Sequence, residues 1–254
     1  MSSPTTPAPV RRRIRLEVWL VLGLSLGQSG VYAVVRLLDV LSRGPLSEAT
    51  ATLNPTRNQR ELFDVVFQLL GIGFALVPVG LALFLLAGDG PGVLRRIGLR
   101  GDTPFRAIRD GIGFTALIGI PGIGVYLLGR ALGVTAEIAT VPANVYWWTA
   151  VLLVLAALQN GVLEEVLMIG YFFTRTSQLG WSPWATIWTS ALVRGSYHLY
   201  QGFGQGVGNV VMGLVFGYWY HRTGRLWPLV IAHTLLDVFA FVGMLVLGER
   251  LGLR

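Results

Sequence analysis

Two adjacent carboxylates interrupt an apolar stretch that runs from Val151 to Phe173. The stretch reads VLLVLAALQNGVLEEVLMIGYFF and is long enough to cross a bilayer as a helix. A charged side chain near the middle of a membrane helix costs about 2.5–3.5 kcal/mol on insertion scales, so such residues are rare and mark functional sites as a rule. Glu164 and Glu165 are therefore the first candidate site residues, and we expect partners for them on other helices.

The remaining sequence indicates a polytopic membrane protein. Of its 254 residues, 53% are hydrophobic and only 13% are charged. We predict an all-α fold, a transmembrane bundle of about seven or eight helices with no separate soluble domain. The apolar segments lie at about residues 18–35, 63–87, 111–129, 146–173, 184–201, 205–220 and 226–247.

Residues 1–16 are predicted to form a disordered basic tail, and residues 17–254 a single transmembrane domain. No small-residue cleavage site follows the basic start, so we expect the first helix to stay uncleaved. All 20 basic residues are arginine, and most of them fall on one side if the N-terminus is inside. The positive-inside rule then predicts a multi-pass protein of the cell membrane with a cytoplasmic N-terminus, and the arginine-only usage fits a GC-rich bacterial source.

The net charge of +7 lies in short loops between apolar segments. That placement suits contact with anionic membrane lipid and argues against nucleic acid as a partner. Cysteine is absent, which excludes disulfides and thiolate metal sites. The basic segment 89–110 is expected to form a cytoplasmic turn or short helix, with Asp102 as a cap ahead of Pro104.

Ionisable residues well inside apolar segments fall in three of the predicted spans. Spacings of i, i+4 place two pairs of them on shared helix faces, and two adjacent acids point about 100° apart. At about 1.5 Å of rise per residue, one acid and two histidines can meet in a cavity in the inner half of the membrane or near its midplane. The acids are Glu164 and Glu165, and the pairs are Arg194 with His198 and His233 with Asp237.

A carboxylate beside two imidazoles can activate a water molecule for attack on a peptide carbonyl. The carboxylate takes the proton, and the imidazoles orient the water or stabilise the oxyanion. Alternatively, zinc or another divalent metal could be held with an open water position. The metal ligands would then be Glu164, His198, His233 and Asp237. No HExxH or GxSxG motif is present, and the residues leave the choice between a metal and no cofactor open.

In order and spacing these motifs resemble the CPBP family, the CAAX-protease and bacteriocin-processing proteins also called the Abi family. The resemblance covers about residues 146–245 and implies an intramembrane endopeptidase acting on a peptide or protein at the membrane. It rests on Glu164-Glu165 with Gly170-Tyr171, on His198-Leu199, on His233-xxx-Asp237 and on the IGLR run at Ile97 to Arg100.

The resemblance also implies roles for these residues. Glu164 would be the water-activating base, with Glu165 as the second acid of the motif. His198 and His233 would bind the water or the oxyanion. Asp237 takes a position where the family usually has asparagine. The family has been described as metal-dependent and as glutamate-type, and the sequence leaves both mechanisms open.

Two positions depart from the family pattern. Ile169 stands where the EExxxR motif has arginine, and Arg194 stands where the FxxxH motif has phenylalanine. We hypothesise that the arginine has been relocated, so that Arg194 neutralises Glu165 from the neighbouring helix.

Two other functions fit the same residues. One is a catalytically silent family member that acts as a scaffold or in bacteriocin immunity. The other is a proton-coupled transporter, because chains of Glu, His and Asp also form proton relays. The lack of inverted repeats disfavours the transporter.

Overall fold

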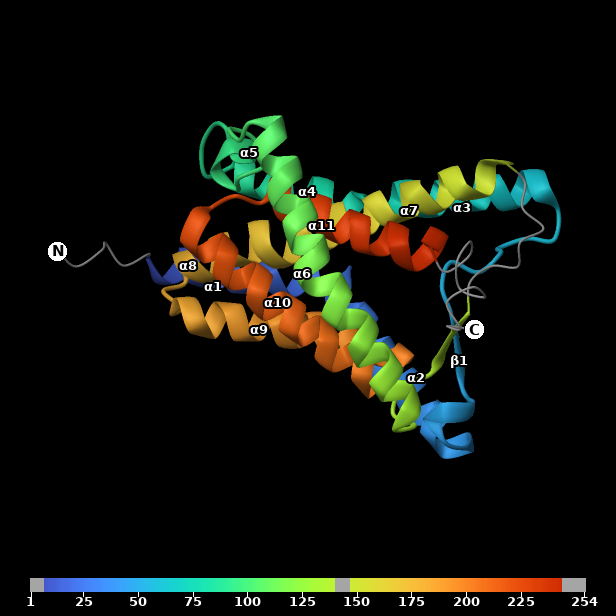
Figure 1. Ribbon diagram of the computed structural model, residues 1–254. Coiled ribbons are helices and arrows are strands. Elements are labelled where there is room, and N and C mark those ends of the chain that lie inside the picture. Colours follow the sequence, from blue (N-terminus) through green and yellow to red (C-terminus); the bar gives the residue numbers. More distant parts are fainter. Residues whose placement is uncertain (1–6, 140–146, 244–254) are drawn as a thin grey trace.

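A computed structural model describes residues 7–139 and 147–243 and shows a bundle of helices (Figure 1). The predicted all-α bundle is confirmed. The helices in chain order are α1 (Ala8–Gly23), α2 (Leu26–Arg43), α3 (Glu61–Ala75), α4 (Val77–Ala87), α5 (Val93–Arg96), α6 (Pro104–Ala131), α7 (Trp147–Glu165), α8 (Phe172–Gln178), α9 (Pro183–Tyr197), α10 (Phe203–Thr223) and α11 (Trp227–Val238).

Short elements complete the described chain. Two of the helical turns are of the 3₁₀ type and two are π-helical. Two three-residue strands pair in parallel, with Thr50 opposite Glu137. Strands this short carry no period-two pattern, so the sequence did not reveal them. The elements are η1 (Leu46–Glu48), β1 (Thr50–Thr52), β2 (Glu137–Ala139), the π-helical η2 (Val166–Tyr171), η3 (Leu199–Gln201) and the π-helical η4 (Phe239–Gly243).

Fewer helices than predicted are long and apolar enough to cross a membrane. Among the described residues they are Glu61–Ala87, Pro104–Ala131 and Trp148–Gln178, with a fourth if α1 and α2, bent by 50°, form one broken span. These match the first four predicted segments. α9 has 15 residues and α11 has 12, both below the roughly 20 that span a bilayer. Seven or eight full spans are therefore not supported by length and hydropathy, and the last predicted segment runs beyond residue 243.

The predicted disordered tail is wrong from residue 8 onward, because α1 begins at Ala8. Tertiary contacts outweigh the polar, proline-rich composition. The guanidinium of Arg11, for example, donates to the backbone carbonyl of Leu179 at 3.2 Å. Residues 1–6 of the predicted tail lie outside the described part of the chain.

The helices that carry the candidate site are packed side by side. α10 lies along α9, and α11 lies between α7 and α6. α6 crosses the face of the bundle in Figure 1, reaching both α11 and α10. The buried core between them includes Ile169, Tyr171, Phe216 and Leu229, each no more than 1% exposed. The site is thus built from helices that support one another directly.

Within segment 89–110, the IGLR turn at Ile97 to Arg100 packs against the connection between α10 and α11. The Gly98 carbonyl accepts from the backbone N–H of Leu226 at 3.1 Å and of Trp227 at 3.2 Å. Gly98 has a φ of +77°, and a Cβ there would collide with the carbonyl oxygen of Gly224. Glycine is therefore required for both backbone angle and space.

Replacing Gly98 by alanine should lower the free energy of unfolding by at least about 2 kcal/mol, because strain and a backbone clash add. Gly92→Ala is the matched control. Gly92 also has a positive φ of +74°, but a Cβ there meets nothing within 4 Å. The midpoint of thermal unfolding in detergent measures the loss of stability. Equal midpoints for Gly98→Ala and Gly92→Ala would contradict the expected cost of the clash at Gly98.

The predicted cap at Asp102 is wrong. Thr103 occupies the cap position of α6 without a side-chain cap bond. Asp102 instead accepts from the Nε of Arg225 at 2.7 Å, and Asp110 accepts from Nη1 at 2.6 Å. Partial burial lowers the pKa of Arg225, but these hydrogen bonds outweigh it and the net pKa is raised. Asp102 is therefore paired with Arg225 and does not cap α6. The ion pairs of Arg225 with Asp102 and Asp110 link the start of α6 to the turn between α10 and α11.

A second cluster of ion pairs links α8 to α1 and to Asp89, which follows α4. Arg175 donates from Nε to Glu17 at 2.6 Å and from Nη1 to Asp89 at 2.5 Å. The Tyr171 hydroxyl donates to the same Glu17 carboxylate at 3.1 Å. The Arg175 side chain is only 3% exposed, so this arginine, in the predicted loop between residues 173 and 184, is an interior residue. The cluster anchors the chain that follows the two glutamates.

Candidate active site

The two glutamates end α7, at the point where the helix widens into the π-helical turn η2. Glu164 is 7% exposed and Glu165 is 0% exposed. A π-helical turn frequently marks a functional site, because it re-aims side chains and leaves backbone groups to be satisfied. Here the buried hydroxyl of Ser190 donates to the Met168 carbonyl in η2 at 2.9 Å. Ser190 therefore supports the turn from α9.

A glycine lets α11 approach the glutamates. A Cβ on Gly161, one turn before Glu164 and Glu165, would lie 3.1 Å from the carbonyl oxygen of Val230 and within contact of Thr234. The small residue thus allows α7 and α11 to pack backbone to backbone. This packing brings His233 beside both glutamates.

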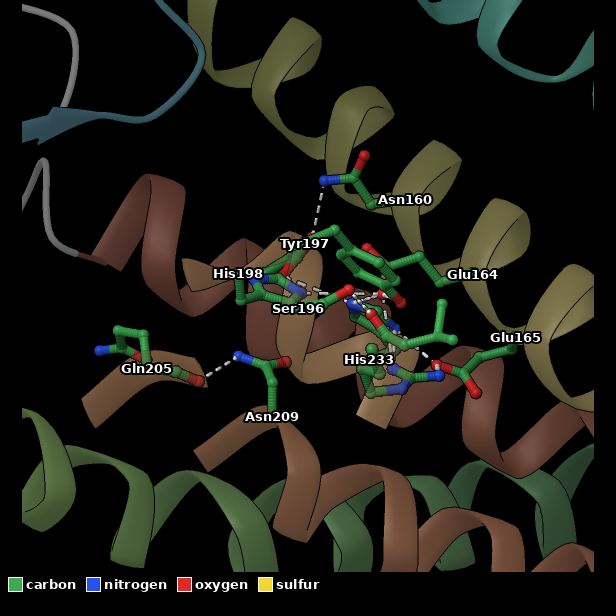
Figure 2. A network of polar contacts seen from close by, with 12 residues as sticks. Asn160, Glu164, Glu165, Ser196, Tyr197, His198, Gln205, Asn209 and His233 are labelled. Carbon is green, nitrogen blue, oxygen red and sulfur yellow. Dashed lines mark hydrogen bonds and ion pairs between the residues drawn. The ribbon is translucent and has the colours of Figure 1, made fainter. Parts of the chain in front are cut away.

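Glu164 meets both histidines, the buried His233 and the half-buried His198, as predicted (Figure 2). Its Oε2 lies 3.8 Å from the Nε2 of His198 and 3.9 Å from the Nε2 of His233. The same oxygen accepts a hydrogen bond from the hydroxyl of Tyr197 at 2.6 Å. Both ring nitrogens of His198 are buried and have no hydrogen-bond partner in the described part of the chain. The imidazole is thus available to a bound molecule.

Glu165 faces different neighbours. Its Oε1 accepts from Arg194 Nη2 at 2.7 Å and lies 2.6 Å from His233 Nδ1. The hypothesised contact between Arg194 and Glu165 is therefore present. An ionised carboxylate can only accept, so Nδ1 of His233 is the donor in this contact, and the Nε2 of the same ring faces Glu164. Glu165 is positioned to orient the imidazole rather than to touch a substrate.

Arg194 is fully buried between these groups. Its Nη1 lies 3.5 Å from Glu164 Oε2, and its guanidinium lies over the ring of Phe216 at 5.8 Å from the centroid. Ile169, at the position where the family motif has arginine, is 1% exposed in the apolar core. The positive charge of the site therefore comes from α9 instead of from α7.

Asp237 lies one turn beyond His233 on α11, as its spacing predicted. Its Oδ1 is 3.8 Å from His233 Nε2, and its Oδ2 accepts from the side-chain amide of Asn160 at 2.9 Å. Sequence reasoning missed Asn160 and Tyr197. Each had a signal, because Asn160 is a polar residue one turn before Glu164 and Tyr197 directly precedes His198.

A cavity of about 1090 Å³ opens onto the site. Its volume suits a peptide segment or a lipid-sized group, and its walls are largely apolar. Glu165 and Arg194 are not among the residues that line it. Those that do include Glu164, His198, His233 and Asp237, with Ile118, Ile123, Val207, Val211 and Leu236 among the apolar walls.

The described side chains show no grouping that would hold a metal ion. Zinc binds nitrogen and oxygen ligands at about 2.0–2.2 Å, which demands that they converge on one point. Across residues 7–139 and 147–243, no three His, Asp or Glu side chains form a group that could hold a metal ion, and the Nε2 atoms of His198 and His233 lie 3.8–3.9 Å from Glu164 Oε2. The Arg194 guanidinium also places a fixed positive charge 3.5 Å from the Oε2 of Glu164, the central ligand candidate.

Comparison with protein families gives a match in the second half of the chain. Residues 146–239 match the family described as type II CAAX prenyl endopeptidase Rce1-like. The resemblance to CAAX-type proteases is confirmed. The Rce1-like segment covers α7 to α11 and contains every candidate residue from Glu164 to Asp237. No curated protein and no solved structure gives a significant match to the chain. The Rce1-like match and the apolar helices together support a membrane hydrolase, an intramembrane endopeptidase of this type.

Proposed function

We propose that this protein hydrolyses a peptide bond of a membrane-associated peptide or protein with water activated by Glu164. The observation that carries the proposal is the convergence of Glu164 Oε2 with the Nε2 atoms of His198 and His233. This convergence lies at a large, mostly apolar cavity within the Rce1-like segment. Such a cavity can accept a peptide segment while excluding bulk water.

In the proposed reaction, a water held between Glu164 and His198 attacks the peptide carbonyl carbon. Glu164 accepts the proton as the carbon–oxygen bond forms, and the imidazoles stabilise the oxyanion. The carbon–nitrogen bond then breaks, and the proton passes from Glu164 to the leaving nitrogen. Each step uses groups within about 4 Å of the Glu164 carboxylate.

Glu165 has a supporting role in this proposal. Its carboxylate orients the ring of His233 through Nδ1 and forms an ion pair with Arg194. Asp237, with Asn160 as its donor, borders His233 on the cavity side. The fixed positive charge of Arg194 favours a glutamate-type mechanism over a metal-dependent one. It already neutralises negative charge of the carboxylates, which a divalent ion would need as ligands.

We further propose the orientation that the arginine distribution predicts, with the N-terminus on the cytoplasmic side of a bacterial cell membrane. The scaffold and transporter alternatives gain no specific support from the site.

The test uses purified protein in liposomes, with a fluorogenic peptide ending in a farnesylated CAAX sequence and its unfarnesylated counterpart as probes. We expect cleavage of at least one probe that persists with a chelator present, and a loss of about 100-fold or more for His198→Ala. His221→Ala is the control, because His221 is exposed at the end of α10. Full cleavage by His198→Ala, cleavage of neither probe by the folded protein, or a chelator-induced loss that zinc restores would contradict the proposal.

A further inference from the structure

The two oxygens of the Glu164 carboxylate are not equivalent. The hydrogen bonds and closest ion-pair contacts of Glu164 with described residues fall on Oε2, at 2.6 Å from the Tyr197 hydroxyl and 3.5–3.9 Å from Arg194 and the two histidines. No described residue donates a hydrogen bond to Oε1. Only the tyrosine contact is short enough to be a strong hydrogen bond.

We propose that Tyr197 is a positioning residue for catalysis, donating its hydroxyl proton to Glu164 Oε2 so that Oε1 is presented to the attacking water. This inference rests on the proposed function and adds a residue to it. Neither the family motifs nor the spacing of ionisable residues singles out Tyr197.

The burial of the pair makes this hydrogen bond effective. Tyr197 is 6% exposed and Glu164 is 7% exposed, so little water competes for either group. A hydrogen bond from a neutral hydroxyl to an ionised carboxylate is about twice as strong as one between neutral groups. The ring of Tyr197 also lies against the imidazole of His198, with 5.0 Å between centroids. One side chain therefore contacts both the base and a neighbouring histidine.

Arg194 explains why Glu164 needs such a restraint. Its Nη1 is 3.5 Å from Glu164 Oε2, longer than a good hydrogen bond, while its Nη2 is bound to Glu165 at 2.7 Å. A glutamate has several rotatable bonds, and a small rotation would let Glu164 close on the guanidinium as well. Both carboxylates would then be occupied by one cation, and the base would be withdrawn from the water. The tyrosine hydroxyl holds Glu164 short of that contact.

Tyr197→Phe removes the hydroxyl and keeps the ring. We expect kcat to fall about 10- to 100-fold with KM changed less than about twofold, because misplacing a catalytic group by about 1 Å has an effect of this size. Tyr220→Phe is the control, since Tyr220 lies on α10 and its hydroxyl donates to the Ile97 carbonyl at 3.3 Å. An unchanged kcat for Tyr197→Phe, or a raised KM with unchanged kcat, would overturn the proposal.

An infrared measurement tests the hydrogen bond without relying on activity. In protein with isotope-labelled tyrosine rings, subtracting the Tyr197→Phe spectrum isolates the phenolic C–O band of Tyr197. We expect Glu164→Gln to shift this band, because the charged acceptor is lost. A band that Glu164→Gln leaves in place would contradict the proposal. Failure of the proposed function shows itself separately, as cleavage retained by Glu164→Gln or His198→Ala.

Discussion

Glu164→Gln should reduce peptide cleavage by about 10²–10⁴-fold, the range that a general base contributes. Glutamine has nearly the same shape and can still accept the hydrogen bond that Tyr197 donates to Oε2. It cannot take a proton from water. The loss should therefore appear in kcat, with the protein folded and the affinity for a peptide probe little changed.

The control for this substitution is Glu61→Gln, which neutralises an exposed glutamate at the start of α3. Cleavage by both variants is measured in the same liposomes, with circular dichroism to confirm equal helix content. Cleavage by Glu164→Gln within about tenfold of the unmodified protein would mean that another group is the base.

Arg194→Met should lower the free energy of unfolding by about 3–5 kcal/mol, the usual cost of removing one partner of a buried ion pair. Methionine retains much of the length of the side chain but leaves the fully buried Glu165 without its 2.7 Å partner. Glu164 also loses its nearest positive charge, 3.5 Å away. Thermal or denaturant unfolding in detergent gives the difference.

Two comparisons make the Arg194 result specific. Arg222→Met removes an exposed arginine at the end of α10 and should change stability little. The double variant Arg194→Met with Glu165→Gln should recover part of the loss, because it removes both charges of the pair. A stable Arg194→Met variant, or a double variant less stable than either single one, would rule out a stabilising pair.

The meeting of distant polar residues could be predicted from the sequence. Ionisable side chains are expensive in apolar helices, so the few present in α7, α9 and α11 had to find one another. The i, i+4 spacing then placed His233 and Asp237 on one face, and the adjacency of Glu164 and Glu165 sent them to different partners. Helix geometry therefore led to the cluster, and the two departures from the family pattern, Ile169 and Arg194, led to the pairing of Arg194 with Glu165.

Residues whose roles depend on tertiary contacts escaped prediction. Tyr197 directly precedes His198, but that position does not show that its hydroxyl reaches Glu164, 33 positions away. Arg175 lies in the predicted loop after residue 173, yet its partner Glu17 lies 158 positions earlier. Local composition likewise misjudged Ala8 to Leu16, which is helical in the structure. Fewer of the described helices than predicted have the length and hydropathy of a membrane span, because α9 and α11 are short.

The central claim is that two neighbouring glutamates have separate tasks, Glu164 in chemistry and Glu165 in holding the site together. The most direct test is the difference in thermal midpoint between Glu164→Gln and Glu165→Gln in the same detergent. Glu165→Gln should have the lower midpoint, because it leaves the fully buried Arg194 without its 2.7 Å ion-pair partner and frees the ring of His233. Equal midpoints, or a lower midpoint for Glu164→Gln, would contradict the division of roles.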